Sequence, residues 1–270
     1  MFIVGPVIFA MWLSLHEWPA LGDMTFVGLR NYVWLFTDPL FGAAAVNTLF
    51  YVALALVAIM PLSLLIASVL NSRGVRFKNF FRTVYFVPII LSGVVVSLVF
   101  NIIFARQSGL LNAVLGGLVG LPPLGWLETS ELARWAILIV MLWRYTGYVM
   151  IFFLAGLQNV PQEQYEAVAL DGGGVWRSFT TVTLPALKPV SAFVVVIVIA
   201  GTSQIFEEPF ILTAGGPDNS TISVAVYIYR IAFQQGLYGE ASAAGIVLFV
   251  AVFFLSRLMT TLFGIGGKDE

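Results

Sequence analysis

The chain of 270 residues has no cysteine and a single histidine, His16. Without cysteine it cannot form a disulfide framework or a cysteine-ligated metal site, although this absence does not decide the cellular compartment. One imidazole does not build a metal site by itself. The sequence also has no Gly-x4-Gly-Lys-Ser/Thr phosphate loop, no His-Glu-x-x-His pair and no Ser/His/Asp set. We therefore expect no catalytic residue, no metal and no cofactor held by this chain.

Charged residues are scarce as well: they make up 10% of the chain, whereas hydrophobic residues make up 60%. The mean hydropathy of +0.96 places the chain outside the soluble globular class and among polytopic membrane proteins. A bilayer span needs about 20 apolar residues, so six spans would take up about half of the chain. We predict an all-α membrane protein with about six transmembrane helices, forming one domain over residues 1–270.

The apolar stretches place the predicted spans. The first has no basic segment in front of it and no small-residue cleavage site, so we interpret it as a transmembrane helix rather than a signal peptide. Because the chain opens inside this span, the completeness of its N-terminus stays open. Pro61 can kink the second span, and Pro88 lies near the beginning of the third. The predicted spans are residues 1–15, 42–70, 81–104, 133–156, 190–206 and 241–263.

Basic residues orient these spans. A short loop after the second span is rich in positive charge, and it contains Arg73, Arg76, Lys78 and Arg82. By the positive-inside rule this loop is cytoplasmic. A nucleic-acid patch is a poor alternative, because membrane-spanning sequence flanks the loop on both sides. Counting spans from here, the segment after the fourth span and the C-terminal tail are cytoplasmic too.

A polar interruption of about residues 158–189 follows the fourth span. Pro161 suits the first turn of a helix, and the three glycines from Gly172 suit its end, because glycine adopts the left-handed conformation without a Cβ clash. A second short helix is predicted from Val175 to about Leu184, where Pro185 limits it. Glu166 lies beside Ala167 and Leu170 at helical spacing, which suits docking into a groove of another protein. The alternative is an amphipathic loop that packs on its own bundle.

This segment resembles the EAA loop of permease subunits of ABC importers, whose pattern is Glu-Ala-Ala, three residues, Gly, nine residues, Ile, any residue, Leu-Pro. The spacing matches throughout, with Val168 in place of the second Ala and Val182 in place of the Ile. In that family the loop is the coupling helix that seats in a cleft of the ATPase subunit. The resemblance therefore implies ATPase coupling by Glu166, Ala167, Leu170, Asp171, Gly172, Leu184 and Pro185.

Further segments resemble the carbohydrate-importer branch of these permeases, related to the maltose, lactose and glycerol-3-phosphate permeases. They are a Gly-Leu-x-Asn-Tyr segment at Gly28, the Asn47-Thr48 pair and a Leu-Thr-x-Gly-Gly-Pro segment at Leu212. Read alone, the Gly-Gly-Pro triplet is only a turn. The resemblance implies a multi-pass permease of the bacterial cytoplasmic membrane that imports a carbohydrate or polyol by alternating access. It also implies the partners: a second permease, two ATP-binding subunits that hold ATP and Mg, an extracytoplasmic solute-binding protein and membrane lipid, but no nucleic acid.

Polar residues inside the spans are candidates for the transport path. A charge at the depth of Arg144 costs about 2.5 to 3.5 kcal/mol on insertion scales, so we expect its side chain to face the bundle or a wet cavity. It either borders the solute path or forms a structural pair. The other candidates are Tyr145, Tyr148, Ser203 and Gln204, each of which could equally be a helix-packing contact.

Two other classes of membrane protein stay open. A secondary transporter would need a buried acidic or ion site and often has inverted repeats. The spans contain no convincing acidic residue at their middle, and the sequence has no clear repeat. A purely structural membrane subunit would not need the spaced loop. Whether uptake depends on ATP or on an ion gradient separates these classes.

Overall fold

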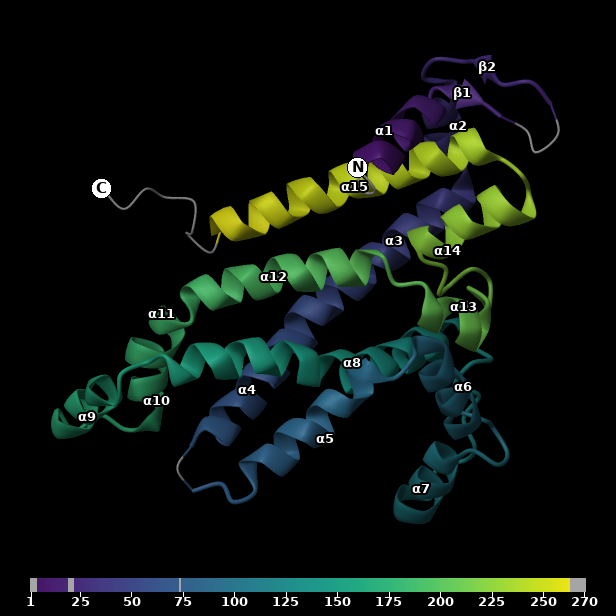
Figure 1. Ribbon diagram of the computed structural model, residues 1–270. Coiled ribbons are helices and arrows are strands. Elements are labelled where there is room, and N and C mark those ends of the chain that lie inside the picture. The colour runs from purple at the N-terminus through teal and green to yellow at the C-terminus, as the bar shows by residue number, and fades with distance from the viewer. Residues whose placement is uncertain (1–3, 19–21, 73, 263–270) are drawn as a thin grey trace, which may run out of the picture. The chain divides into compact units, whose positions relative to one another are not determined.

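The computed structural model describes residues 4–18, 22–72 and 74–262. Helices make up nearly all of its regular structure (Figure 1). Strands β1 (His16–Glu17) and β2 (Thr25–Phe26) form a short antiparallel pair with His16 opposite Phe26. The predicted all-α class is confirmed.

The chain divides into two compact units. Unit 1 consists of Met1–Val52, Gly93–Val140 and Gly201–Phe254, and unit 2 of Ala53–Ser92, Met141–Ala200 and Leu255–Glu270. By the same count of spans, the connections between the first and second, the third and fourth, and the fifth and sixth spans are predicted to be external, and all three fall in unit 1. The basic loop and the polar segment 158–189, both predicted to be cytoplasmic, fall in unit 2. Arg73 of the basic loop and the tail from residue 263 lie outside the described residues.

Four helical stretches are long and apolar enough to cross a membrane: Pro39–Asn71, Ser130–Gln158, Lys188–Thr213 and Tyr238–Leu262. They correspond to the predicted second, fourth, fifth and sixth spans. The stretch Pro39–Asn71 contains α3 (Pro39–Leu54), η1 (Ala55–Ile59) and α4 (Met60–Asn71). The stretch Lys188–Thr213 contains α12 (Lys188–Ser203) and α13 (Glu207–Thr213). The other two stretches are the single helices α8 (Ser130–Gln158) and α15 (Tyr238–Leu262).

The predicted third span is broken into two helices, α5 (Lys78–Ile90) and α6 (Gly93–Ile103). Leu91 between them has an extended backbone with φ −70° and ψ 142°. Pro88 weakens the last turn of α5, because it donates no backbone hydrogen bond and its ring crowds the carbonyl four residues earlier. Hydropathy does not reveal this break, since the sequence is apolar on both sides.

The span count of six stays a prediction. Within the described residues there are four candidate spans, or five if α5 and α6 are counted as one. The only helix in the described part of the predicted first span is α1 (Val4–Leu13), 10 residues long. At 1.5 Å per residue, a helix of that length covers about half of a hydrocarbon core of about 30 Å.

Shorter helices complete the connections. They are α2 (Arg30–Thr37), α7 (Leu110–Val119), α14 (Val224–Tyr229) and the π turn η3 (Arg230–Gln234) in unit 1, and α9 (Gln162–Leu170), α10 (Val175–Ser178), the π turn η2 (Phe179–Thr183) and α11 (Leu184–Ala186) in unit 2.

Two prolines of unit 2 each follow a π-helical turn. Just before Pro61, Met60 N–H donates to Ala55 O, and just before Pro185, Leu184 N–H donates to Phe179 O. The wider turn moves the carbonyl that would otherwise meet the proline ring. The prediction that Pro185 limits the second helix of the polar segment is therefore wrong, because helical backbone continues through it in α11.

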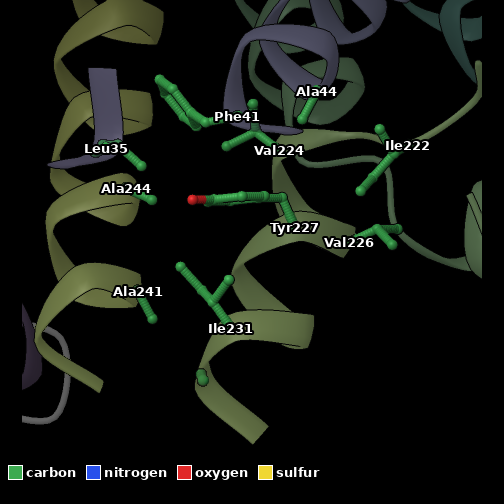
Figure 2. Packing of buried hydrophobic residues seen from close by; sticks show 11 residues of the cluster. Leu35, Phe41, Ala44, Ile222, Val224, Val226, Tyr227, Ile231, Ala241 and Ala244 are labelled. Atoms are coloured by element: carbon green, nitrogen blue, oxygen red, sulfur yellow. The ribbon is translucent and has the colours of Figure 1, made fainter. Parts of the chain in front are cut away.

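The core of unit 1 joins segments that are far apart in the sequence. Figure 2 shows Tyr227 of α14 within this cluster. Its hydroxyl donates to Asp38 Oδ2 over 2.7 Å. Burial, and then the hydrogen bond to the Asp38 carboxylate, raise the pKa of Tyr227 well above its ordinary value, so the phenol remains a donor. The cluster consists of Leu35, Phe41, Ala44, Ile222, Val224, Val226, Tyr227, Ile231, Ala232, Ala241 and Ala244.

Candidate functional site

The polar segment after α8 folds into a helical hairpin of α9 and α10, which we call the coupling hairpin (residues 161–178) (Figure 1). Pro161 caps α9, and Glu163 in its first turn lies at the positive end of the helix dipole. Gly172 has a φ of +72°. Gly172 N–H donates to Ala169 O and Gly173 N–H to Val168 O, which closes the C-terminus of α9. The predicted helix and its glycine stop are confirmed.

The coupling hairpin exposes apolar side chains that a soluble surface would normally cover. Leu170 is 89%, Val175 90% and Trp176 76% exposed. The Trp176 ring stacks on that of Phe179, the next residue after the hairpin, with centroids 5.8 Å apart. Grouped apolar exposure of this kind marks a protein or membrane contact.

The residues predicted for ATPase coupling all lie at the surface of unit 2. Glu166 and Leu170 are four residues apart on α9 and therefore share one helix face. The full set is exposed: Glu166, Ala167, Leu170, Asp171, Gly172, Leu184 and Pro185. This placement leaves the set available to a partner, and its coupling role stays a prediction.

Tyr165, directly before Glu166, was not predicted as a functional residue. Its hydroxyl oxygen lies 3.1 Å from Thr183 Oγ1, and either atom can be the donor. Thr183 is the last residue of η2 and is buried. The sequence carried no signal for this pair, since it depends on how the hairpin folds back on η2.

Arg144 is buried in α8. Its Nη1 donates to Tyr145 Oη over 3.4 Å, and the guanidinium carbon lies 5.3 Å from the centre of the Tyr145 ring. Such a cation–π contact lowers the cost of holding a charge away from water. The burial agrees with the expectation that this side chain faces protein, whereas a role in the solute path stays a prediction.

The other predicted path residues have different surroundings. The half-buried Tyr148 packs edge-on against Phe152, with ring centroids 5.1 Å apart. Ser203 is buried and Gln204 is exposed. Arg144, Tyr145 and Tyr148 belong to unit 2, whereas Ser203 and Gln204 belong to unit 1. Their shared role therefore stays a prediction. Among the described residues, no group of three or more His, Asp or Glu could hold a metal ion.

The Asn47-Thr48 pair holds the segment that contains Gly-Gly-Pro, a connection that the sequence did not predict. Asn47 Nδ2 donates to Asn219 O over 2.9 Å and to Ile222 O over 3.0 Å. Thr48 Oγ1 accepts from Val224 N–H over 3.0 Å. The two motifs noted separately in the sequence thus form one structural unit inside unit 1.

The family described as binding-protein-dependent transport system inner membrane component matches residues 59–264. The chain belongs to this family. A relative of this chain, the probable ABC transporter permease protein YurN of Bacillus subtilis (strain 168), is 36% identical over 274 residues, which cover 100% of this chain and 93% of YurN. The lactose transport system permease protein LacF of Rhizobium radiobacter is 36% identical over 257 residues, covering 93% of this chain and 86% of LacF.

A solved structure has the same fold. It is the crystal structure of a bacterial alginate ABC transporter in complex with an alginate pentasaccharide-bound periplasmic protein. One of its chains matches with a TM-score of 0.81 and 26% identity, covering 96% of this chain and 90% of that one. The resemblance to ABC importer permeases is confirmed, and this chain is a multi-pass transport permease.

Proposed function

We propose that this permease forms half of the translocation path of a bacterial importer for a carbohydrate or a related polyol. Its partners are a second, different permease, an extracytoplasmic solute-binding protein and two ATP-binding subunits. The lactose relative and the alginate transporter support the solute class. The complex with a periplasmic protein in the alginate transporter supports the binding-protein partner. The location is the bacterial cytoplasmic membrane.

The observation that carries the ATPase coupling is the coupling hairpin. Glu166 lies exposed on α9, while Leu170 and Trp176 leave apolar surface uncovered on the same hairpin. In a specific protein interface, apolar side chains that become buried on docking typically lie beside a charge that orients the partner. The ATP-binding subunits bind ATP and Mg, and this chain holds neither.

The mechanism couples two sites through two global states of the complex. ATP binding closes the ATP-binding subunits, and the hairpin moves with them. The bundle then switches from inward-open to outward-open, and the docked solute-binding protein releases its solute into the cavity. Coupling of this kind requires different contacts at both sites in the two states.

Glu166→Lys tests this proposal. A reversed charge in a desolvated interface costs about 2 to 5 kcal/mol, enough to abolish docking, so we expect loss of ATP-driven uptake while the chain stays inserted. The measurement is uptake into vesicles that contain the purified complex and its solute-loaded binding protein. Glu131→Lys, an exposed carboxylate in the first turn of α8, is the matched control and should retain uptake.

Normal uptake by the Glu166→Lys complex would contradict the coupling role. Uptake by the unaltered complex that persists without ATP and follows an imposed ion gradient would favour a secondary transporter instead. Binding of the solute-binding protein to a library of sugars, oligosaccharides, polyols and glycerol phosphates identifies the solute.

A further inference from the structure

We propose that Tyr165 is a positioning residue that passes movement of the coupling hairpin into α12 through its hydrogen bond to Thr183. This inference rests on the proposed docking of ATP-binding subunits on the hairpin. The two hydroxyl oxygens lie 3.1 Å apart and join α9 to the end of η2. Tyr165 and Glu166 are adjacent in α9, so their side chains leave the helix about 100° apart. Glu166 is exposed to a partner, while Tyr165 is half-buried.

The hairpin side of this contact is loosely packed. Within α9, which the structure describes in full, no side chain is buried. A groove of about 550 Å³ lies beside this contact, and its lining includes Ser68 and Asn71 of α4, Leu157 of α8, Tyr165 of α9 and Thr183 of η2. A close-packed contact would transmit a displacement directly, but a groove of this size does not. The Tyr165–Thr183 hydrogen bond is therefore a direct side-chain link from α9 to η2, in addition to the backbone that runs from α10 into η2.

The Thr183 side of the contact is firmly held. Thr183 is buried, and its carbonyl accepts from Leu187 N–H over 3.0 Å. A Cβ added at Gly156 of α8 would lie 2.7 Å from Leu187 Cδ2 and 2.9 Å from Val190 Cγ2. Helix α8 thus approaches the start of α12 closely, as small residues allow in membrane helices. A displacement of Thr183 therefore also displaces α8 and α12, which are packed together.

The π turn η2 lies at this contact and gives the helix a place where its backbone can adjust. Its last hydrogen bond runs from Leu184 N–H to Phe179 O, and Thr183 is its final residue. Single π turns inside α-helices often mark functional positions, because the extra residue can be taken up or released without breaking the helix. The joint formed by Tyr165, Thr183 and η2 thus connects the hairpin to α12, which ends at the predicted path residue Ser203.

The test compares hydroxyl deletions in the reconstituted complex with bound ATP-binding subunits. Tyr165→Phe and Thr183→Val each remove one partner of the bond, while Thr183→Ser keeps the hydroxyl. Thr181→Val is the matched control, since the Thr181 hydroxyl donates to Arg177 O within its own helix. The readout is solute taken up per ATP hydrolysed, with lactose, labelled oligosaccharides and polyols as probes. We expect this ratio to fall about threefold or more in both deletions.

The outcomes separate this inference from the proposed function. Thr183→Ser and Thr181→Val should keep the ratio, and the double variant Tyr165→Phe with Thr183→Val should lose no more than either single variant, because both remove one interaction. Three results would contradict the proposed role of the Tyr165–Thr183 hydrogen bond. They are an unchanged ratio of solute to ATP in both deletions, additive losses in the double variant, and loss of the ATP-binding subunits from both complexes. If Glu166→Lys also transports normally, the proposed function itself fails.

Discussion

A single amide, that of Asn47, holds a connection more than 170 residues away in the sequence. Its two hydrogen atoms are donated to the carbonyls of Asn219 and Ile222, and the side chain is buried. Tyr51 Oη also donates to Thr221 O, and Arg134 Nε donates to Ser220 O. Backbone carbonyls of an irregular segment thus find side-chain donors, which a segment buried in a membrane protein requires.

Asn47→Ala should destabilise this segment, because the Ile222 carbonyl loses a buried hydrogen bond and the Asn219 carbonyl a partly buried one. An unsatisfied buried group costs about 1 to 3 kcal/mol, so we expect the free energy of unfolding to fall by about 2 kcal/mol or more. The unfolding midpoint of the purified complex and protease cleavage within residues 213–223 measure this effect. Asn79→Ala, where the side chain is exposed, should change the midpoint little. Equal midpoints for the two variants would contradict the role of Asn47.

Residue types alone did not reveal these bonds. The sequence showed that Asn47-Thr48 and Gly-Gly-Pro belong to one family pattern, but not that one holds the other, because hydrogen bonds across such a sequence separation depend on the fold. Arg144 is the contrasting case. Its burial followed from the cost of a charge at mid-span, which is a local property of the sequence.

At the level of helices, α5 and α8 meet at Gly147 within unit 2. A Cβ at Gly147 would overlap the backbone carbonyl of Tyr85. Backbone atoms cannot move aside as a flexible side chain can, so the two helices fit only because this position has no side chain.

Gly147→Ala should therefore force α5 and α8 apart. Overpacking of this kind costs typically about 1 to 3 kcal/mol, and more where backbone is the obstacle. The yield of folded complex after detergent extraction and its unfolding midpoint should both fall. Gly42→Ala in α3 is the control, because a Cβ there meets nothing within 4 Å. A Gly147→Ala complex as stable as the Gly42→Ala complex would show that this helix contact is not close.

Hydropathy and proline positions predicted the long helices but not their irregularities. The bounds of α8 and α15 lie within a few residues of the predicted spans. The π turns before Pro61 and Pro185, and the break after Ile90, were not predicted. They depend on how each backbone accommodates a proline against its neighbours, and apolar composition is the same whether a helix is straight, widened or broken.

At the level of the whole molecule, the sequence predicts a sidedness, and the segments predicted for the two sides fall in different compact units, while the sidedness itself stays a prediction. The basic loop and the coupling hairpin belong to unit 2, and the connections predicted to be external belong to unit 1. The matched spacing of the EAA-like segment and the charge bias are independent properties of the sequence, yet both place residues 158–189 in the cytoplasm. The family match supports a transport permease of this kind.

The most direct test of this account uses the absence of native cysteine. Ala167→Cys places one thiol on the exposed face of α9, where a maleimide-linked photoreactive probe can attach. In sealed cells an impermeant maleimide added outside should leave this thiol unmodified, and photolysis of the purified complex should join it to an ATP-binding subunit. Val114→Cys in α7, also exposed, should be modified from outside and give no such adduct. Modification of Ala167→Cys from outside, or no adduct in any nucleotide state, would contradict the coupling of this permease to an ATPase.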